Sequence, residues 1–318
     1  MQYRRLGSSG LLVSEISLGS WLTYGNGVDD ETSIRTMDRA YDLGVNFFDT
    51  ANVYNRGEAE KVVGRALKKR ERSTYVLATK VFFPMADLPN HSGLSRKHIM
   101  ESVHASLKRL GLEYVDILYC HRHDPNTPVE ETLRAFDDLI RQGKVLYGGI
   151  SEWTAAQIEE AARVADRFLL NRFVASQPRY SLMHRAIERE VVPVSERNGI
   201  GQVVFSPLAQ GLLTGKYKKP GEAPGDSRAA SDKMNVFIKH SLTEENVGLA
   251  KRLGKVADDL GIPLTRMALA WVLRLQNVAS ALVGASRPDQ IEENVLASGI
   301  ALPQDALERI DRVLEGEE

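Results

Sequence analysis

Four polar side chains stand at or just after the ends of apolar runs in the first half of the chain. Asp49 ends the run VNFFD, and Tyr54 follows it five residues later. Lys80 ends the run YVLATK, and His121 ends VDILYCH. Each residue alone has an ordinary structural interpretation, such as a helix cap for Asp49 or an ion-pair partner for Lys80. Brought together, a carboxylate, a phenol, an ammonium group and an imidazole could instead transfer a proton.

The chemistry that fits this set is protonation of an oxygen on which negative charge develops. A phenol has a pKa near 10, and an ammonium group a few ångströms away would lower the pKa of Tyr54 by favouring the phenolate. Asp49 would hold Lys80 charged and oriented, and His121 could steer a substrate oxygen or share the proton. General acids of this kind contribute about 10²–10⁴-fold in rate. A carbonyl that receives hydride needs this help.

Eight short apolar segments alternate with helical patterns along the chain. Strands that alternate with helices imply a parallel sheet with right-handed crossovers. A count of eight predicts a (β/α)8 TIM barrel, an α/β fold whose strands point their carboxyl ends at the catalytic rim. No GxGxxG follows the first segment, so a Rossmann nucleotide site is not supported. The segments are EISLG (15–19), VNFFD (45–49), YVLATK (75–80), VDILYCH (115–121), VLYGGIS (145–151), FVASQ (173–177), QVVFS (202–206) and ASALVGAS (279–286).

Other segments predict additions to the barrel. YRRLGSSGLLVS (3–14) is typical of an N-terminal β-hairpin, which could plug the bottom of the barrel. Helical patterns at 244–260 and 263–275 both precede the eighth strand, so one of them is an extra helix, and another extra helix covers about 303–314. The stretch 207–243 fits neither pattern, and a loop this long is usually functional or partly disordered.

The composition excludes several classes of protein. The 41 basic and 42 acidic residues nearly cancel, so we expect no nucleic-acid partner. The longest apolar run, Met267–Leu273, is too short for membrane insertion, and the N-terminus lacks the apolar core of a signal peptide. A single cysteine, Cys120, excludes an intramolecular disulfide. We therefore expect a cytoplasmic protein with a single domain over 1–318.

A metal site is not expected. His121 and His123 form an HxH pair, but no further histidine clusters with them in the sequence.

Longer motifs around these residues resemble the aldo-keto reductases, in particular the branch that contains the voltage-gated potassium channel β subunits and their microbial relatives. The motifs are FFDTANVYNRGEAE, RLGLEYVDILYCHRHDPNTPVEETL, SPLAQGLLTGKY and ALVGASRPDQIEENV. The resemblance covers nearly the whole chain. It implies an NADPH-dependent barrel in which Asp49, Tyr54, Lys80 and His121 are the catalytic residues.

The resemblance also implies a set of cofactor-binding residues. Ser151 and Gln177 match residues that hold the nicotinamide carboxamide, and Phe205 matches an aromatic that stacks on the nicotinamide ring. The segment that matches the pyrophosphate site supplies Ser206, Pro207, Leu208, Gln210 and Gly211. The remaining matches are Lys216, Ser286 and Gln290 near the adenosine and its 2'-phosphate, Glu293 and Asn294 at the adenine, Arg228 in a loop that closes over the cofactor, Gly284 in the last strand, and Trp21 in the wall of the site.

The residue types agree with an NADP(H) site. Lys216, Arg228 and Arg287 are cations in or after the loops of the last two strands, where barrel phosphate sites tend to lie. A helix that begins near Pro288 would point its N-terminus at a phosphate. Each cation alone is an ordinary surface charge, but together with the motif they favour NADPH over NADH.

Two positions depart from the pattern of the relatives. The channel β subunits have Asn at the position of His121, so His121 restores the four residues of active reductases. Phe205 keeps a stacking surface but lacks the polar tip of the Tyr or Trp that is common there.

Three hypotheses follow. The first is an NADPH-dependent reductase of a small carbonyl substrate. The second is an NADP(H)-binding regulatory or channel-β-like subunit with slow turnover, and the third is a Schiff-base aldolase that uses Lys80. The sequence leaves open the substrate, the direction of the reaction, a membrane-protein partner and whether the chain forms a homo-oligomer.

Overall fold

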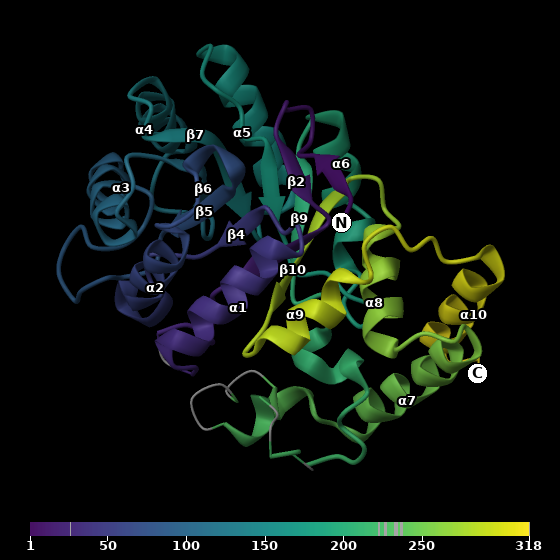
Figure 1. Ribbon diagram of the computed structural model, residues 1–318. Coiled ribbons are helices and arrows are strands. Elements are labelled where there is room, and N and C mark those ends of the chain that lie inside the picture. The colour runs from purple at the N-terminus through teal and green to yellow at the C-terminus, as the bar shows by residue number, and fades with distance from the viewer. Residues whose placement is uncertain (26, 222, 226–227, 232–234, 236–237, 318) are drawn as a thin grey trace.

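A closed barrel of eight parallel strands forms the centre of the molecule (Figure 1). The computed structural model describes residues 1–25, 27–221, 223–225, 228–231, 235 and 238–317. Around the barrel the strands follow the order β10-β3-β4-β5-β6-β7-β8-β9, so the TIM barrel predicted from the sequence is confirmed. The strands are β3 Ile16–Gly19, β4 Phe47–Asp49, β5 Val76–Val81, β6 Val115–Cys120, β7 Val145–Ser151, β8 Ala175–Gln177, β9 Gly201–Phe205 and β10 Val278–Gly284.

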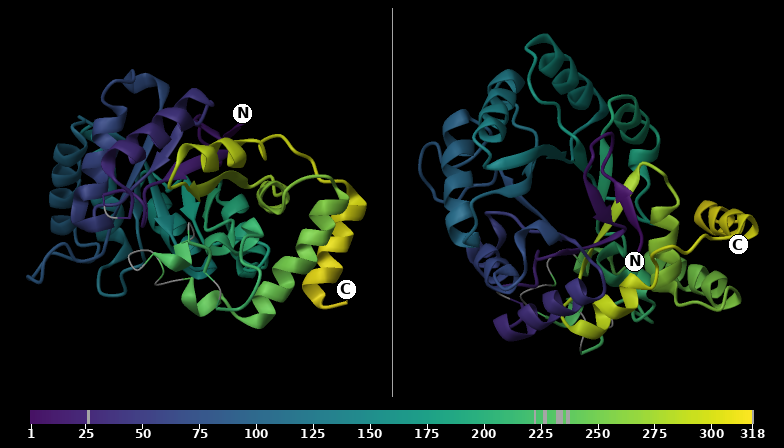
Figure 2. Two further views of the ribbon diagram at one scale, coloured as in Figure 1. Left: turned by 60° about the horizontal axis from the view of Figure 1, so that its bottom comes forward. Right: turned by 45° about the horizontal axis from the view of Figure 1, so that its top comes forward.

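Helices surround the barrel as an outer ring, as the right-hand view of Figure 2 shows. Cap residues set several of their starts: the Ser95 side chain accepts a hydrogen bond from His98 N, and Thr154 forms a capping box with Gln157. The ring helices are α1 Asp30–Asp42, α2 Glu58–Leu67, α3 Arg96–Leu110, α4 Val129–Arg141, α5 Ala155–Arg167, α6 Val191–Arg197, α8 Leu264–Leu273 and α9 Pro288–Val295.

Two helices lie outside this ring. They are α7 Glu244–Asp259 and α10 Gln304–Glu315, which lie side by side (Figure 1). They confirm the predicted extra helices before the last strand and at the C-terminal end. In the described part of the chain, no helix has both the length and the apolar character needed to cross a bilayer.

The N-terminal hairpin closes the bottom of the barrel. Its strands are β1 Tyr3–Arg5 and β2 Leu12–Ser14, paired antiparallel. Leu6 and Val13 are fully buried and pack in one cluster with Phe47 and other barrel-interior side chains. This confirms the predicted plug, and it leaves the opposite rim as the open end of the barrel.

The pleat of the strands turns the predicted catalytic residues inward at that open rim. Phe47, Ala78 and Tyr119 belong to the cluster inside the barrel. Asp49, Lys80 and His121 lie two residues further along β4, β5 and β6, and side chains two apart point to the same face. Cys120 points the other way and is fully buried in the layer between barrel and helices, so it is not part of the site.

Candidate active site

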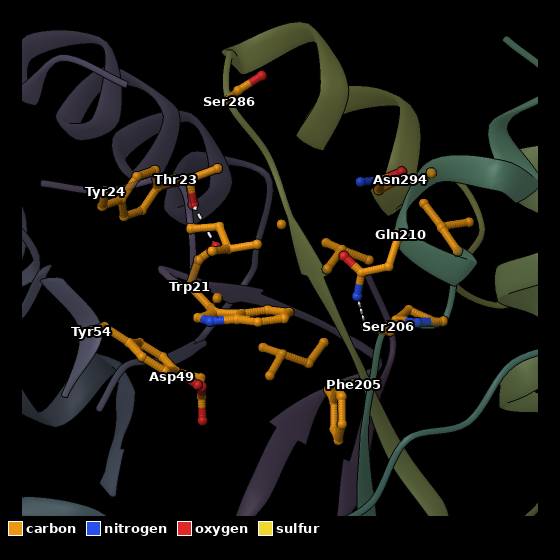
Figure 3. A pocket seen from close by; sticks show the side chains of 18 of the residues that line it. Trp21, Thr23, Tyr24, Asp49, Tyr54, Phe205, Ser206, Gln210, Ser286 and Asn294 are labelled. Carbon is orange, nitrogen blue, oxygen red and sulfur yellow. Dashed lines mark hydrogen bonds between the residues drawn. The ribbon is translucent and has the colours of Figure 1, made fainter. Parts of the chain in front are cut away.

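A cavity of about 1010 Å³ opens at the carboxyl ends of the strands (Figure 3). Tyr54 and Asp49 lie on one side of it, and Ser286 and Asn294 lie on another. Lys80 hydrogen-bonds Tyr54 but does not line the cavity. Of Arg228 the structure describes the backbone and not the side chain. All other predicted site residues line it: Trp21, Asp49, Tyr54, His121, Ser151, Gln177, Phe205, Ser206, Pro207, Leu208, Gln210, Gly211, Lys216, Gly284, Ser286, Gln290, Glu293 and Asn294.

Lys80 connects the side chains that the sequence predicts to be catalytic. Its Nζ donates to Asp49 Oδ1, to the Thr50 carbonyl oxygen at 2.9 Å and to the Tyr54 hydroxyl oxygen at 3.2 Å. Asp49 Oδ2 accepts a second hydrogen bond, from Gln177 Nε2 at 2.9 Å. The three donor hydrogens of the ammonium group are therefore all directed at oxygen atoms, which fixes the position of the charge.

The ion pair between Lys80 and Asp49 is almost completely buried, so neighbouring groups strongly affect the pKa of each side chain. Lys80 is 1% exposed and Asp49 is 2% exposed. Burial alone would lower the pKa of Lys80, but the adjacent Asp49 carboxylate and Tyr54 raise it above the ordinary lysine value. Lys80 therefore stays protonated, and it presents a fixed positive charge to the phenol.

The pKa of Tyr54 differs from the sequence expectation. Lys80 does lower the pKa of Tyr54, but desolvation of the hydroxyl raises it more, so the net pKa lies above the ordinary phenol value. The expected net lowering was therefore wrong for the protein without bound ligand. The consequence is that Tyr54 is fully protonated at neutral pH and is poised to give up a proton.

His121 is a neutral imidazole. Its side chain is buried, and burial lowers its pKa well below the ordinary value, helped by the charges of Lys80 and Arg122. Its ring lies edge-on to Tyr54, with 5.7 Å between ring centroids, and edge-on to Phe83 at 4.8 Å. Among the described residues its Nδ1 has no hydrogen-bond partner. The ring therefore has hydrogen-bonding capacity left for a ligand.

The loop that carries Tyr54 is held by its backbone. Asn55 and Arg56 have positive φ of 46° and 51°, and Gly57 follows at 91°. The Asn55 side chain donates to the Gly25 carbonyl oxygen. A Cβ at Gly57 would lie 2.6 Å from Arg109 Cδ, so glycine allows both the turn and the close contact.

Left-handed backbone is concentrated at this end of the barrel. Of the nine described non-glycine residues with positive φ, eight lie in loops that follow strands. Such conformations cost of order 1–3 kcal/mol each and occur mostly at functional sites. Those that line the cavity are Leu22, Asn55, Glu152, Ser206 and Gln210.

The predicted cofactor residues form three groups in the structure. Ser151 Oγ donates to the Gln177 carbonyl oxygen at 2.8 Å, so these two residues adjoin the catalytic group through Asp49. Gln210 Nε2 donates to Ser206 Oγ at 2.6 Å within the strained loop after β9. Across the cavity, Gln290 Oε1 accepts from Ser286 N at 2.8 Å.

Glu293 is engaged elsewhere in this structure. Both of its carboxylate oxygens accept from Arg266 of α8, at 2.7 and 2.9 Å. Asn294, its neighbour, is buried at the cavity wall. The family resemblance implies that both residues lie at the adenine, but it did not identify the pair with Arg266.

Sequence reasoning missed three residues of the catalytic end. Thr50 supplies a carbonyl oxygen to Lys80, and Phe83 packs against His121. Arg122 lines the cavity and contributes its charge to the surroundings of Tyr54 and His121. Arg122 directly follows a strand-end residue, so its position at the rim could have been read from the sequence.

The described residues contain no group of three or more His, Cys, Asp or Glu side chains arranged to hold a metal ion. His123 instead packs edge-on against Trp153, with 4.8 Å between the ring centroids.

Comparison with known proteins gives the same family that the motifs resemble. The model of the aldo/keto reductase family matches residues 15–315. An Arabidopsis thaliana protein named "Probable voltage-gated potassium channel subunit beta" is 43% identical over 320 residues, which cover 99% of this chain and 97% of that protein. A protein of the same name from Oryza sativa subsp. japonica is 42% identical over 320 residues, again covering 99% and 97%. These matches support an oxidoreductase function, and the chain belongs to the aldo/keto reductase family.

Proposed function

We propose that this protein reduces an aldehyde or ketone to an alcohol with NADPH. The observation that carries the proposal is the hydrogen bond between the buried Lys80 ammonium group and the Tyr54 hydroxyl, which faces a cavity beside the neutral His121. Membership of the aldo/keto reductase family supports an oxidoreductase in general. The arrangement of these side chains favours carbonyl reduction in particular, because it supplies a proton donor where an alkoxide would form.

The cavity fits a long, phosphate-bearing cofactor. Its volume, about 1010 Å³, is at the upper end of the range of about 300–1,000 Å³ for small-molecule sites. Lys216 and Arg287 line it, and α9 begins with Pro288 beside Arg287, so the helix N-terminus adds positive potential there. We assign this region to the phosphates, and the region around Asp49, Tyr54 and His121 to the nicotinamide. When bound, NADPH would supply the hydride that reaches the carbonyl carbon.

The remaining cofactor contacts are assigned by position. Ser151 and Gln177 would hold the nicotinamide carboxamide, and Phe205 would stack on the ring. The loop after β9 would bind the pyrophosphate, with its backbone already in the left-handed conformation at Ser206 and Gln210. Gln290, Glu293 and Asn294 of α9 would hold the adenosine end.

The residues of this chain then complete the reaction. Tyr54 would give its hydroxyl proton to the carbonyl oxygen as the carbon receives hydride, and Lys80 would stabilise the phenolate that remains. His121 would donate a ring N–H to the same oxygen and so orient the carbonyl. Solvent would return the proton to Tyr54. In the reverse direction the phenolate would accept the proton of an alcohol.

The names of the relatives favour a second candidate function. The protein would bind NADP(H) and act as a regulatory subunit of a channel-like partner, with slow turnover. This candidate predicts cofactor binding without appreciable consumption of NADPH.

The two candidates are separated by measuring cofactor binding and cofactor consumption together. NADPH and NADH binding would be followed by quenching of tryptophan fluorescence, and consumption by the absorbance of the reduced cofactor with a panel of aldehydes. We expect tighter binding of NADPH than of NADH, and turnover with at least one aldehyde. Tight binding of NADPH without turnover of any aldehyde would favour the regulatory subunit, and failure to bind NADPH would contradict both.

A further inference from the structure

A cation stands at the catalytic end of the cavity. Arg122 directly follows His121, is half-buried and lines the cavity. Its Nη1 donates to the His121 carbonyl oxygen at 2.5 Å and approaches Ser151 Oγ at 3.5 Å. Its guanidinium carbon lies 5.7 Å from the centroid of the Phe83 ring. These contacts fix the guanidinium group in the same wall as His121.

No carboxylate of the described residues balances this cation within 4.0 Å. Other partly buried arginines have one: Arg109 pairs with Glu60 and Arg72 pairs with Asp116, each at 2.6 Å. Partial burial removes water from a guanidinium group, which costs free energy. Without a carboxylate nearby, no ion pair offsets that cost. A cation left in this state beside a ligand cavity indicates that the partner is an anion supplied by the ligand.

The cofactor phosphates do not account for Arg122. The cavity has other cations, Lys216 and Arg287, in the region assigned to the phosphates above. Arg122 adjoins His121 instead, and its charge lowers the pKa of both Tyr54 and His121. The carbonyl substrate, rather than a phosphate of the cofactor, is the ligand expected at this end.

A carboxylate at the rim does not neutralise the site. Glu152 follows Ser151 and lines the cavity, but its Oε1 accepts from the backbone N–H of Arg179 at 2.7 Å. This bond holds the Glu152 side chain toward Arg179, and the structure records no ion pair between Glu152 and Arg122.

We propose that Arg122 binds an anionic group of the substrate, so that the preferred substrates are small aldehydes or ketones that carry a carboxylate or a phosphate. The planar guanidinium fork matches the oxygens of either group. Trp21 lies beside Tyr54 and Asp49 (Figure 3), and Phe83 packs against His121, so both line the catalytic end and offer apolar surface to the carbon skeleton. This inference rests on the proposed reductase function and specifies its substrate class.

The test compares pairs of para-substituted benzaldehydes in which one member carries an anionic group and the other a neutral group. 4-Carboxybenzaldehyde is paired with 4-formylbenzamide, and 4-formylphenyl phosphate with 4-methoxybenzaldehyde, in the full-length protein with saturating NADPH at low ionic strength. We expect kcat/KM to be higher for at least one anionic member, by about ten- to hundredfold and mainly through KM. The pair that shows the preference identifies the anionic group.

Substitution of Arg122 tests whether this residue causes the preference. Arg122→Gln should remove the preference for the anionic aldehyde, and Arg122→Lys should keep part of it. The ratio within a pair is the readout, because any effect of the substitution on Tyr54 or His121 applies to both members. Arg163→Gln removes the same charge from the exposed face of α5 and should leave the ratio unchanged.

Three results would overturn the assignment. One is the absence of a preference for either anionic aldehyde in the wild type, and another is a preference that persists in Arg122→Gln. Loss of NADPH binding in both Arg122 variants would also overturn it, because Arg122 would then hold the cofactor. If the wild type reduced none of the four aldehydes, the reductase function itself would fail, which is a separate outcome.

Discussion

The protonation states of Tyr54 and His121 determine which of them could donate a proton in the candidate active site. The pKa of Tyr54 is raised above the ordinary phenol value by desolvation, and the pKa of His121 is lowered well below the ordinary imidazole value by burial. In the proposed reaction, Tyr54 is therefore the acid and His121 the neutral hydrogen-bond donor over the whole physiological range. This assignment has a direct consequence for the pH dependence of the reaction.

The rate of reduction should be independent of pH over a wide window. Tyr54 must be protonated to act, and a raised pKa keeps it so up to the ordinary phenol value of 10.0. His121 must be neutral, and a lowered pKa keeps it so down to the ordinary imidazole value of 6.5. We expect kcat/KM for a neutral aldehyde to be flat between these two values. A titration with its midpoint inside this window, under conditions in which circular dichroism shows a folded protein, would contradict the assignment.

At the level of elements, α2 directly follows the loop that carries Tyr54, and it packs closely on α3. Gly64 of α2 meets the C-terminal end of α3 so closely that an added Cβ would lie 2.8 Å from the carbonyl carbon of Leu110 and closer still to its oxygen. Backbone atoms cannot move aside cheaply, so this contact requires glycine.

Gly64→Ala should therefore lower the free energy of unfolding by about 1–3 kcal/mol, the usual cost of overpacking. Gly254→Ala in α7 is the matched control, because a Cβ there meets nothing within 4 Å. The control should stabilise the protein by about 0.5–1 kcal/mol through helix propensity. Urea denaturation of both variants measures the difference. Equal effects of the two substitutions would show that the contact with Leu110 does not matter.

The sequence predicted the elements better than their contacts. All eight strands were located because their apolar runs alternate with helical periodicity, although β4 and β8 are shorter than predicted and span Phe47–Asp49 and Ala175–Gln177. The strand-end residues of the site followed from the same pattern. The pair between Glu293 and Arg266 and the net rise in the pKa of Tyr54 could not be read from the sequence, because both depend on groups brought together only by folding.

For the whole molecule, the N-terminal hairpin and the candidate active site lie at opposite ends of the barrel. The N-terminal hairpin packs Leu6 into the bottom, where the side chain is fully buried. Arg4 of the same hairpin donates to the carbonyl oxygens of Leu273 and Val278 and pairs with Glu15. These contacts join the hairpin to the end of α8 and the start of β10, far from the open rim.

Leu6→Ala should destabilise the fold without changing the site. The cavity left in the plug should cost about 2–5 kcal/mol of unfolding free energy, while the Kd for NADPH stays the same. Leu12→Ala, in the same hairpin but at a side chain that is 50% exposed, should change stability by less than about 0.5 kcal/mol. A higher Kd for NADPH in the folded Leu6→Ala protein would show that the hairpin end of the barrel and the candidate active site are coupled.

The central claim is that Tyr54 protonates the carbonyl oxygen, and a comparison of the wild type with Tyr54→Phe tests it most directly. The substitution removes the hydroxyl and keeps the ring that lies near His121. We predict an unchanged Kd for NADPH and a loss of kcat of about 10²–10⁴-fold with an aldehyde that the wild type reduces. A Tyr54→Phe protein that binds NADPH and reduces the aldehyde at the wild-type rate would contradict the account.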